Sequence, residues 1–287
     1  TLSQIVKRYD TKGQPVFQSY PQRGVDNAWS VTQGIRTAYD ALGRTTRVEQ
    51  DSEHGVLATN TEYLPGLKTR VTNPRGHQTT TSFMAWDQPG YELPILSEQP
   101  EGKVIEIGRH PRFGWPLQLK QRNSSGSLQH SRHYVYDGHA QLCKTIEPET
   151  GATVTGYDAA NNPSWTATGL TGGNYAAITT CSQVEASASG RVVNRSYDAR
   201  NRPTQLNFPD GRGNQVWTYE KDGLPASITT YNDASNATPV INAYTYNSRR
   251  LPIGESVSQP GWYTWGVGYE YDNLGNLRWQ SYPAGLT

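Results

Sequence analysis

The sequence of 287 residues has little charge, no excess of either sign and no long apolar run. Charged residues make up 18%, and 26 Lys and Arg against 25 Asp and Glu give a formal net charge of +1. No segment concentrates the positive charges, which excludes the electrostatic footprint of a nucleic-acid or anionic-membrane partner. No run approaches the ~18 apolar residues of a transmembrane helix. We therefore expect no nucleic-acid partner and no membrane span in this segment.

Cysteine and methionine are also scarce. Two cysteines, Cys143 and Cys181, are too few for a disulfide scaffold or a four-cysteine zinc site. We expect two separate reduced thiols packed as small apolar groups, with one bridge between them as the alternative, because sequence does not supply the geometry of a disulfide. The single methionine, Met84, lies inside patterned sequence and the chain begins at Thr1. We therefore expect an excerpt of a longer protein, with any targeting signal outside it.

Aromatic and turn-forming residues are abundant instead. The chain has 18 Tyr and 8 Trp but only 4 Phe, together with 28 Gly and 18 Pro. Aromatic side chains suit half-buried pleated surfaces, whereas Gly and Pro interrupt strands with turns. This composition predicts an all-β fold.

A degenerate repeat, Tyr-Asp-x-x-Gly, runs through the whole chain. Its clear copies begin at Tyr9, Tyr39, Tyr136, Tyr157, Tyr197, Tyr219, Tyr246 and Tyr271. Degraded copies from Trp86 and His110 partly fill the gap between Tyr39 and Tyr136. A weaker element with Pro and Gly alternates with the first, at Asn73, Gln99, Glu147, Phe208 and Tyr282. Self-similarity of this kind decides the fold before any other signal.

Each part of the repeat has a structural interpretation. The Tyr ends an alternating strand, where its ring can be buried while its hydroxyl finds a partner. The Asp accepts hydrogen bonds from the following backbone N–H groups, and Gly or Asn three positions later supplies a positive φ. The Pro-Gly element is a second turn at the other end of the hairpin. One repeat is thus two antiparallel strands of about 6 to 9 residues.

We assign a structural role to the motif residues and expect no catalytic, cofactor-binding or metal-binding residue. The motif residues are Tyr9, Asp10, Gly13, Tyr39, Asp40, Gly43, Tyr136, Asp137, Tyr157, Asp158, Asn161, Tyr197, Asp198, Asn201, Tyr219, Gly223, Tyr246, Tyr271, Asp272 and Gly275.

One segment interrupts the repeat. Residues 164–194 are small and polar and carry Cys181. We predict a loop-like insert there, with 180–188 as the one place for a short helix.

The YD units resemble the Rhs or YD-repeat family, which includes bacterial polymorphic toxins, shell components of insecticidal toxin complexes and the animal teneurins. The resemblance covers essentially the whole chain, residues 1–287. It implies a β-hairpin ribbon that forms part of a spiral β-shell enclosing a C-terminal toxic domain. The chain lacks the C-terminal cap and self-cleavage region of that family and is short for a closed shell, so we expect one stretch of shell wall.

Two polar clusters invite a chemical interpretation. His130, His133, His139 and Cys143 offer zinc ligands, but residues three apart on a strand face opposite ways. We expect no metal site there. Asp51, Glu53 and His54 could form an acid–base group, but a solvated turn explains them better.

Exposed aromatics are a further alternative. Trp115, Trp262, Trp265 and Trp279 with Tyr263 could stack on sugar rings, whereas packing in the core is the interpretation that we favour.

The sequence therefore predicts a structural, non-enzymatic wall segment of an Rhs-type toxin without cofactors. We expect its partners to be the rest of its own polypeptide, including an enclosed C-terminal toxin domain, and a secretion apparatus. We expect the protein to be secreted or delivered from a bacterial cell and to act in interbacterial competition. The alternative is an adhesive or carbohydrate-binding surface of a cell-wall-associated YD-repeat protein. A β-rich enzyme with an unrecognised site is the third hypothesis.

Overall fold

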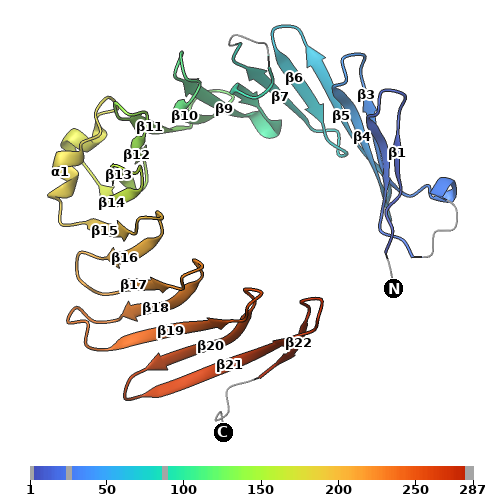
Figure 1. The fold of residues 1–287 in the computed structure, drawn as a ribbon. Helices are drawn as coiled ribbons and strands as arrows, with labels where there is room; N and C mark the ends of the chain where they lie inside the picture. The colour runs from blue at the N-terminus through green and yellow to red at the C-terminus, as the bar shows by residue number, and fades with distance from the viewer. Residues whose placement is uncertain (1–2, 24–27, 86–89, 282–287) are drawn as a thin grey trace. The chain divides into compact units, whose positions relative to one another are not determined.

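The computed structural model describes residues 3–23, 28–85 and 90–281. The chain divides into two compact units, Thr1–Arg132 and His133–Thr287. In each unit most described residues lie in antiparallel strands that follow one another in chain order (Figure 1). The prediction of an all-β fold built from antiparallel hairpins is confirmed. Among these residues, none of the helices has the length and apolar character to cross a membrane.

The first unit is a meander in which each strand pairs with the next. A short 3-10 helix, Ala28–Ser30, precedes its third strand, and another, Pro100–Gly102, precedes its ninth. Its strands are β1 (Lys7–Tyr9), β2 (Pro15–Ser19), β3 (Gly34–Tyr39), β4 (Thr45–Ser52), β5 (Gly55–Leu64), β6 (Lys68–Thr72), β7 (Gln78–Phe83), β8 (Pro94–Glu98), β9 (Lys103–Arg109) and β10 (Pro116–Asn123).

The second unit continues the same pattern. Strand β11 (Gln129–Tyr136) runs across the boundary, and its residues from His133 onward pair with β12. The following strands are β12 (Leu142–Glu147), β13 (Gly151–Tyr157), β14 (Pro163–Leu170), β15 (Val192–Tyr197), β16 (Pro203–Asn207), β17 (Asn214–Tyr219), β18 (Pro225–Tyr231), β19 (Pro239–Tyr246), β20 (Pro252–Gln259), β21 (Tyr263–Tyr271) and β22 (Leu277–Gln280).

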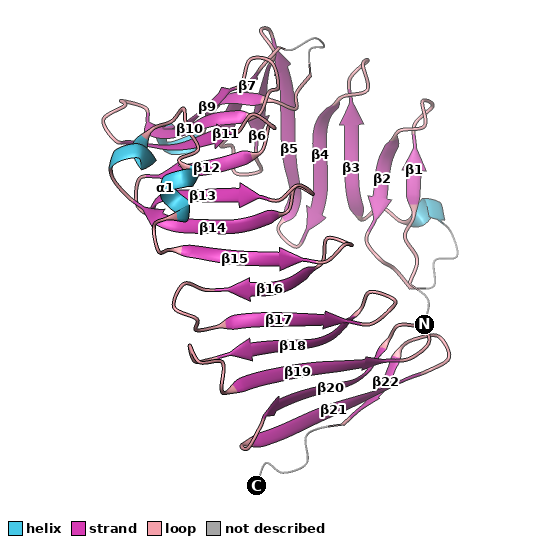
Figure 2. Cartoon of the chain, turned by 60° about the vertical axis from the view of Figure 1, so that its left-hand side comes forward, coloured by secondary structure: helices cyan, strands magenta, loops and turns pink. Residues whose placement is uncertain are grey.

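The insert between β14 and β15 is shorter than the sequence predicts. Residues 164–170 belong to β14, which pairs with β13 as far as Leu170, because their alternation continues the hairpin that begins at Tyr157. The remainder holds a 3-10 helix, Gly173–Ala176, and helix α1 (Gln183–Ser187), which lies against β13 and β14 (Figure 2). The short helix predicted within 180–188 is confirmed.

Few of the described side chains are fully buried, and a cluster of buried apolar residues lies beneath the insert. Ala186 of α1 packs with residues of β13 and β14, and partly buried rings of Trp165 and Tyr175 extend the cluster. Its buried members are Ala152, Val154, Ala167, Leu170 and Ala186. A ribbon with so little fully buried surface depends strongly on hydrogen bonds between neighbouring hairpins.

Every YD turn has the same register. The Tyr pairs with the residue six positions later, after a bulge that shifts the register by one residue. The pairs are Tyr9 with Pro15, Tyr39 with Thr45, Tyr136 with Leu142, Tyr157 with Pro163, Tyr197 with Pro203, Tyr219 with Pro225, Tyr246 with Pro252 and Tyr271 with Leu277.

Candidate functional site

The YD turn is closed by one carboxylate oxygen and one residue with positive φ. In the repeat at Tyr197, Asp198 Oδ1 accepts the N–H of Arg200 at 2.8 Å and that of Arg202 at 3.0 Å. Asn201, with φ 59°, donates its N–H to the Asp198 carbonyl at 2.9 Å. The same pair of contacts to Oδ1 occurs at Asp10, Asp40, Asp137, Asp158 and Asp272. The aspartates therefore act as acceptors for backbone N–H groups in every one of these turns.

Other side chains fill the Asp position in some turns. Asn73 and Asn247 accept the same two N–H groups through Oδ1. The segment at Asn73, which we assigned to the weaker Pro-Gly element, is thus a turn of the YD type. In the degraded copy at His110, the ring Nδ1 accepts from the N–H groups of Arg112 and Phe113. The copy predicted from Trp86 begins outside the described residues.

Several tyrosine hydroxyls link their repeat to the one before it. Each of these hydroxyls donates to the carbonyl of the residue that starts the second strand of the preceding hairpin, at 2.7 to 3.1 Å. The links run from Tyr39 to Pro15, Tyr157 to Leu142, Tyr197 to Pro163, Tyr219 to Pro203 and Tyr246 to Pro225. Burial raises the pKa of Tyr157, Tyr219 and Tyr246, which favours the protonated, donating hydroxyl.

A second set of links reaches forward from the residue after the turn. The amides of Gln141 and Asn162 donate to the Oδ1 of the next turn's asparagine, at 2.7 Å to Asn161 and 2.9 Å to Asn201. Gln14 donates similarly to the carbonyl of Gly43 at 3.1 Å. Adjacent hairpins are therefore joined in both directions along the chain.

Where the residue after the turn is an arginine, it stacks on the next repeat's tyrosine. The Arg44 guanidinium lies 4.0 Å from the ring centroid of Tyr63, and that of Arg202 lies 4.1 Å from the ring of Tyr219. Each arginine also pairs with its own turn aspartate. The hydrogen bond from the Arg202 side chain is the main cause that lowers the pKa of Asp198 to about 2.

One repeat was missed in the sequence. Tyr63 donates its hydroxyl to the Thr45 carbonyl at 3.1 Å, and Leu67, four residues later, has φ 57°. Both features match the other repeats, although Leu64 replaces the Asp. Tyr63 follows Tyr39 by 24 residues, within the ~21 to 30 residue spacing of the clear copies, and this spacing was the signal that could have found it.

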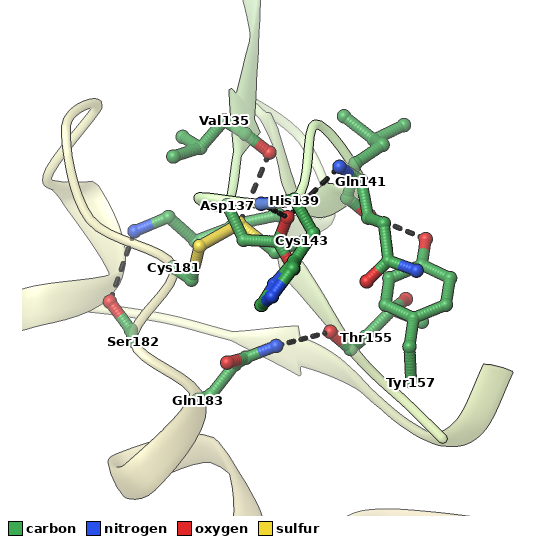
Figure 3. Close-up of a disulfide and its surroundings, with 12 residues drawn as sticks. Val135, Asp137, His139, Gln141, Cys143, Thr155, Tyr157, Cys181, Ser182 and Gln183 are labelled. Atoms are coloured by element: carbon green, nitrogen blue, oxygen red, sulfur yellow. Dashed lines mark hydrogen bonds between the residues drawn. A yellow bond between two sulfur atoms is a disulfide. The ribbon is translucent and has the colours of Figure 1, made fainter. Parts of the chain in front are cut away.

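The insert is fastened to the ribbon by a disulfide. Cys143 of β12 and Cys181 are bonded across 38 residues, with a Cα–Cα distance of 5.4 Å (Figure 3). The prediction of two separate reduced cysteines is therefore wrong, because the insert folds back over β12, which the sequence separation did not reveal.

A buried lysine reinforces this attachment. Lys144, only 1% exposed, donates through Nζ to Ser182 Oγ at 3.0 Å and to the Asn174 carbonyl at 3.3 Å. Desolvation lowers the pKa of Lys144. The ammonium thus ties two points of the insert to the same strand as the disulfide.

Two residues of the clusters considered as chemical sites, Cys143 and Asp51, form structural contacts. In the part of the chain that the structure describes, no three His, Cys, Asp or Glu side chains are grouped as metal ligands. Cys143 is in the disulfide. Asp51 is not a freely solvated turn residue, because it forms an ion pair with Arg36 at 2.9 Å and accepts the N–H of Gly34.

The expectation that the tryptophans pack in a core is wrong for three of them. Trp262, Trp265 and Trp279 are 81%, 49% and 51% exposed. Tyr263 stacks on Trp265 with their centroids 4.7 Å apart. These residues lie in and beside β21 and β22.

Comparison with known proteins identifies the fold. No family model matches the chain, and no curated protein matches it at a significant level. Among solved structures, a chain of the Photorhabdus luminescens Tc holotoxin pore with a mutated TccC3 is similar over 98% of this chain, with a TM-score of 0.59 and 13% identity. A TcdB2-TccC3 chain is aligned over 94%, at 14% identity and a TM-score of 0.38.

This chain spans only 16% of the holotoxin chain and 20% of the TcdB2-TccC3 chain. At such low identity the first likeness shows a shared fold. The repeats and the fold agree, and the chain is a ribbon of YD hairpins with the fold of part of a Tc toxin.

Proposed function

We propose that this chain is a structural, non-enzymatic segment of a shell wall. The observation that carries the proposal is the two-way linkage of successive hairpins, in which the repeated Tyr and Asp side chains are used as hydrogen-bonding groups of the ribbon. A residue that recurs in every repeat serves what every repeat requires, which here is turn closure and attachment to the neighbouring hairpin. The Tc toxin fold supports the same assignment.

The finer proposal is that the wall belongs to an Rhs-type toxin and encloses a C-terminal toxic domain that is delivered to competing bacteria. The disulfide supports a location outside the reducing cytosol, because disulfides persist in oxidising compartments. The partners would then be the enclosed domain and the apparatus that secretes the protein.

Limited proteolysis of the full natural gene product tests the enclosure. We expect a domain that follows this chain to resist protease in the intact protein and to be cleaved rapidly when expressed alone. Equal cleavage rates in both forms would reject encapsulation. Assays of the purified chain for nuclease, protease, glycosidase and NAD-degrading activity should show no turnover, and turnover abolished by one point mutation would reject the non-enzymatic role.

The exposed aromatic rings favour one other function. Trp262 and Trp265 at the start of β21 give an adhesive or carbohydrate-binding surface a physical basis. Binding to a polysaccharide panel that Trp265→Ala abolishes would support this alternative, and no binding by the wild-type chain would remove it.

A further inference from the structure

A polar pocket lies where two successive YD turns meet the insert. Its volume is about 370 Å³, within the usual range for small-molecule sites. Both turns and the insert belong to the second unit. The side chains that line it and carry the argument are Asp137, His139, Gln141, Tyr157, Asp158 and Gln183.

The insert supplies the wall that turns the gap between two repeats into a pocket. Gln183, the first residue of α1, donates through Nε2 to the Thr155 carbonyl of β13 at 3.0 Å. The disulfide of Cys181 fixes the chain two residues before it, and Lys144 holds the intervening Ser182. Figure 3 shows Gln183 approaching the turn that carries His139 from the side of the disulfide. The pocket therefore depends on the attachment of the insert.

The polar groups around the pocket include acceptor oxygens, beside the His139 ring and the side-chain amides. Asp137 uses Oδ1 to close its turn, and Gln141 and Gln183 use their amide nitrogens as donors within the chain. Asp137 Oδ2 and the side-chain carbonyls of both glutamines accept no hydrogen bond from the described residues. Asp158, whose oxygens accept hydrogen bonds within its own turn, adds a second negative charge, so the lining suits a ligand that carries hydroxyl and ammonium donors.

The charge of the lining also favours a cationic ligand. Hydrogen bonds from the Asn162 backbone and side chain lower the pKa of Asp158, so this carboxylate stays ionised near neutral pH. The Tyr157 ring beside the carboxylates offers an aromatic surface to a cation or to the apolar face of a sugar.

We propose that this insert-walled pocket binds a protonated amino sugar of monosaccharide size. Its hydroxyls would donate to Gln141 and Gln183, and its ammonium would lie near Asp137. This role goes beyond that of a wall segment, since it belongs to the one repeat junction that carries the insert.

Calorimetric titration of the whole chain with glucosamine near neutral pH tests the proposal. We expect saturable binding at one site, and at least about tenfold weaker binding of glucose, which lacks the charge, and of ethylammonium, which lacks the ring. Equal binding of glucose would overturn the role of the carboxylates. Absence of glucosamine binding would overturn the site.

Asp137→Asn is a variant that preserves the turn, because Asn73 and Asn247 close the same turn elsewhere in the chain. It should weaken glucosamine binding about tenfold or more, since a charged hydrogen-bond partner is lost. Asp10→Asn makes the same change at a turn outside the pocket and should leave the affinity unchanged. Equal effects of the two variants would overturn the assignment.

A second pair of variants tests the wall contributed by the insert. Gln183→Ala removes a lining group, whereas Val184→Ala alters an 81% exposed neighbour on the same helix. Only the first should weaken binding, and reduction of the disulfide should weaken it as well. Affinity that is unaffected by both Gln183→Ala and reduction would place any glucosamine site elsewhere and refute the proposal.

Discussion

Removal of the hydroxyl from a single repeat tyrosine tests how strongly that hydroxyl stabilises the contact between neighbouring hairpins. Tyr157 donates to the Leu142 carbonyl at 2.8 Å in a partly buried position, and Tyr197 donates to the Pro163 carbonyl at 3.1 Å in an exposed one. Phenylalanine keeps the half-buried ring and deletes only the donor. The difference between variant and wild type therefore isolates the link from the packing of the ring.

The expected loss follows from the exchange of a protein hydrogen bond for one to water. A neutral hydrogen bond contributes about 0.5–1.5 kcal/mol net, and more where the abandoned acceptor is shielded from solvent. We expect Tyr157→Phe to lower the free energy of unfolding by about 1.5 kcal/mol and Tyr197→Phe by about 0.5 kcal/mol. The two losses should not simply add in the double variant, because Tyr157 pairs with Pro163, whose carbonyl accepts the Tyr197 hydroxyl.

Urea denaturation followed by tryptophan fluorescence measures these losses. Tyr9→Phe is the matched control, because Tyr9 occupies the same motif position in the first repeat, is 58% exposed and has no hydroxyl partner among the described residues. It should unfold at the wild-type midpoint. If Tyr157→Phe and Tyr9→Phe were equally stable, the hydroxyl links would not hold the ribbon together.

Three further results are expected. Asp198 has its pKa lowered to about 2 by Arg202 and the turn N–H groups. The carboxylate therefore stabilises the folded state at pH above its unfolded pKa of about 4, and this stabilisation is lost as the pH falls from there through about 2. Asp198→Asn should make the urea midpoint depend less on pH between about 4 and 2. An unchanged pH dependence of the midpoint would contradict the pairing of Asp198 with Arg202. Asn201→Val should cost about 2–3 kcal/mol, through its positive φ and the lost bond from Asn162, while Asn201→Gly should change stability by less than about 1 kcal/mol. Wild-type stability of Asn201→Val would show the turn to be wrongly described. Reduction of the disulfide, which closes a loop of 38 residues, should cost roughly 4 kcal/mol in the chain-entropy account, and calorimetry showing no shift in the second unit's transition would count against it.

The sequence was sufficient for features with local causes. The spacing from Asp198 to Asn201 predicts the turn because both partners lie within four residues, and the structure has the positive φ at Asn201. The all-β fold follows similarly from strand and turn signals repeated along the chain. Short-range hydrogen bonds and backbone sterics leave direct marks in residue order.

Features that depend on contacts between neighbouring repeats are harder to predict from the sequence. The hydroxyl of Tyr197 bonds to Pro163, 34 residues away, and nothing in either residue specifies the other. Cys143 and Cys181 meet only because the insert folds back onto β12. Tyr63 escaped notice because its turn lacks the Asp, although its hydroxyl link is intact. Contacts of this kind are set by how hairpins stack, which motif spacing alone does not encode.

Because the tyrosine hydroxyl links and the turn amide links described above join successive hairpins, duplication or deletion of a repeat changes mainly the contacts to its neighbours. A gene built this way can change length in steps of one hairpin. The sequence of each repeat can change as long as its contacts to the two neighbouring hairpins are kept. The turn at His110 is consistent with such change, because an imidazole nitrogen there accepts backbone N–H groups as a carboxylate oxygen does in the YD turns.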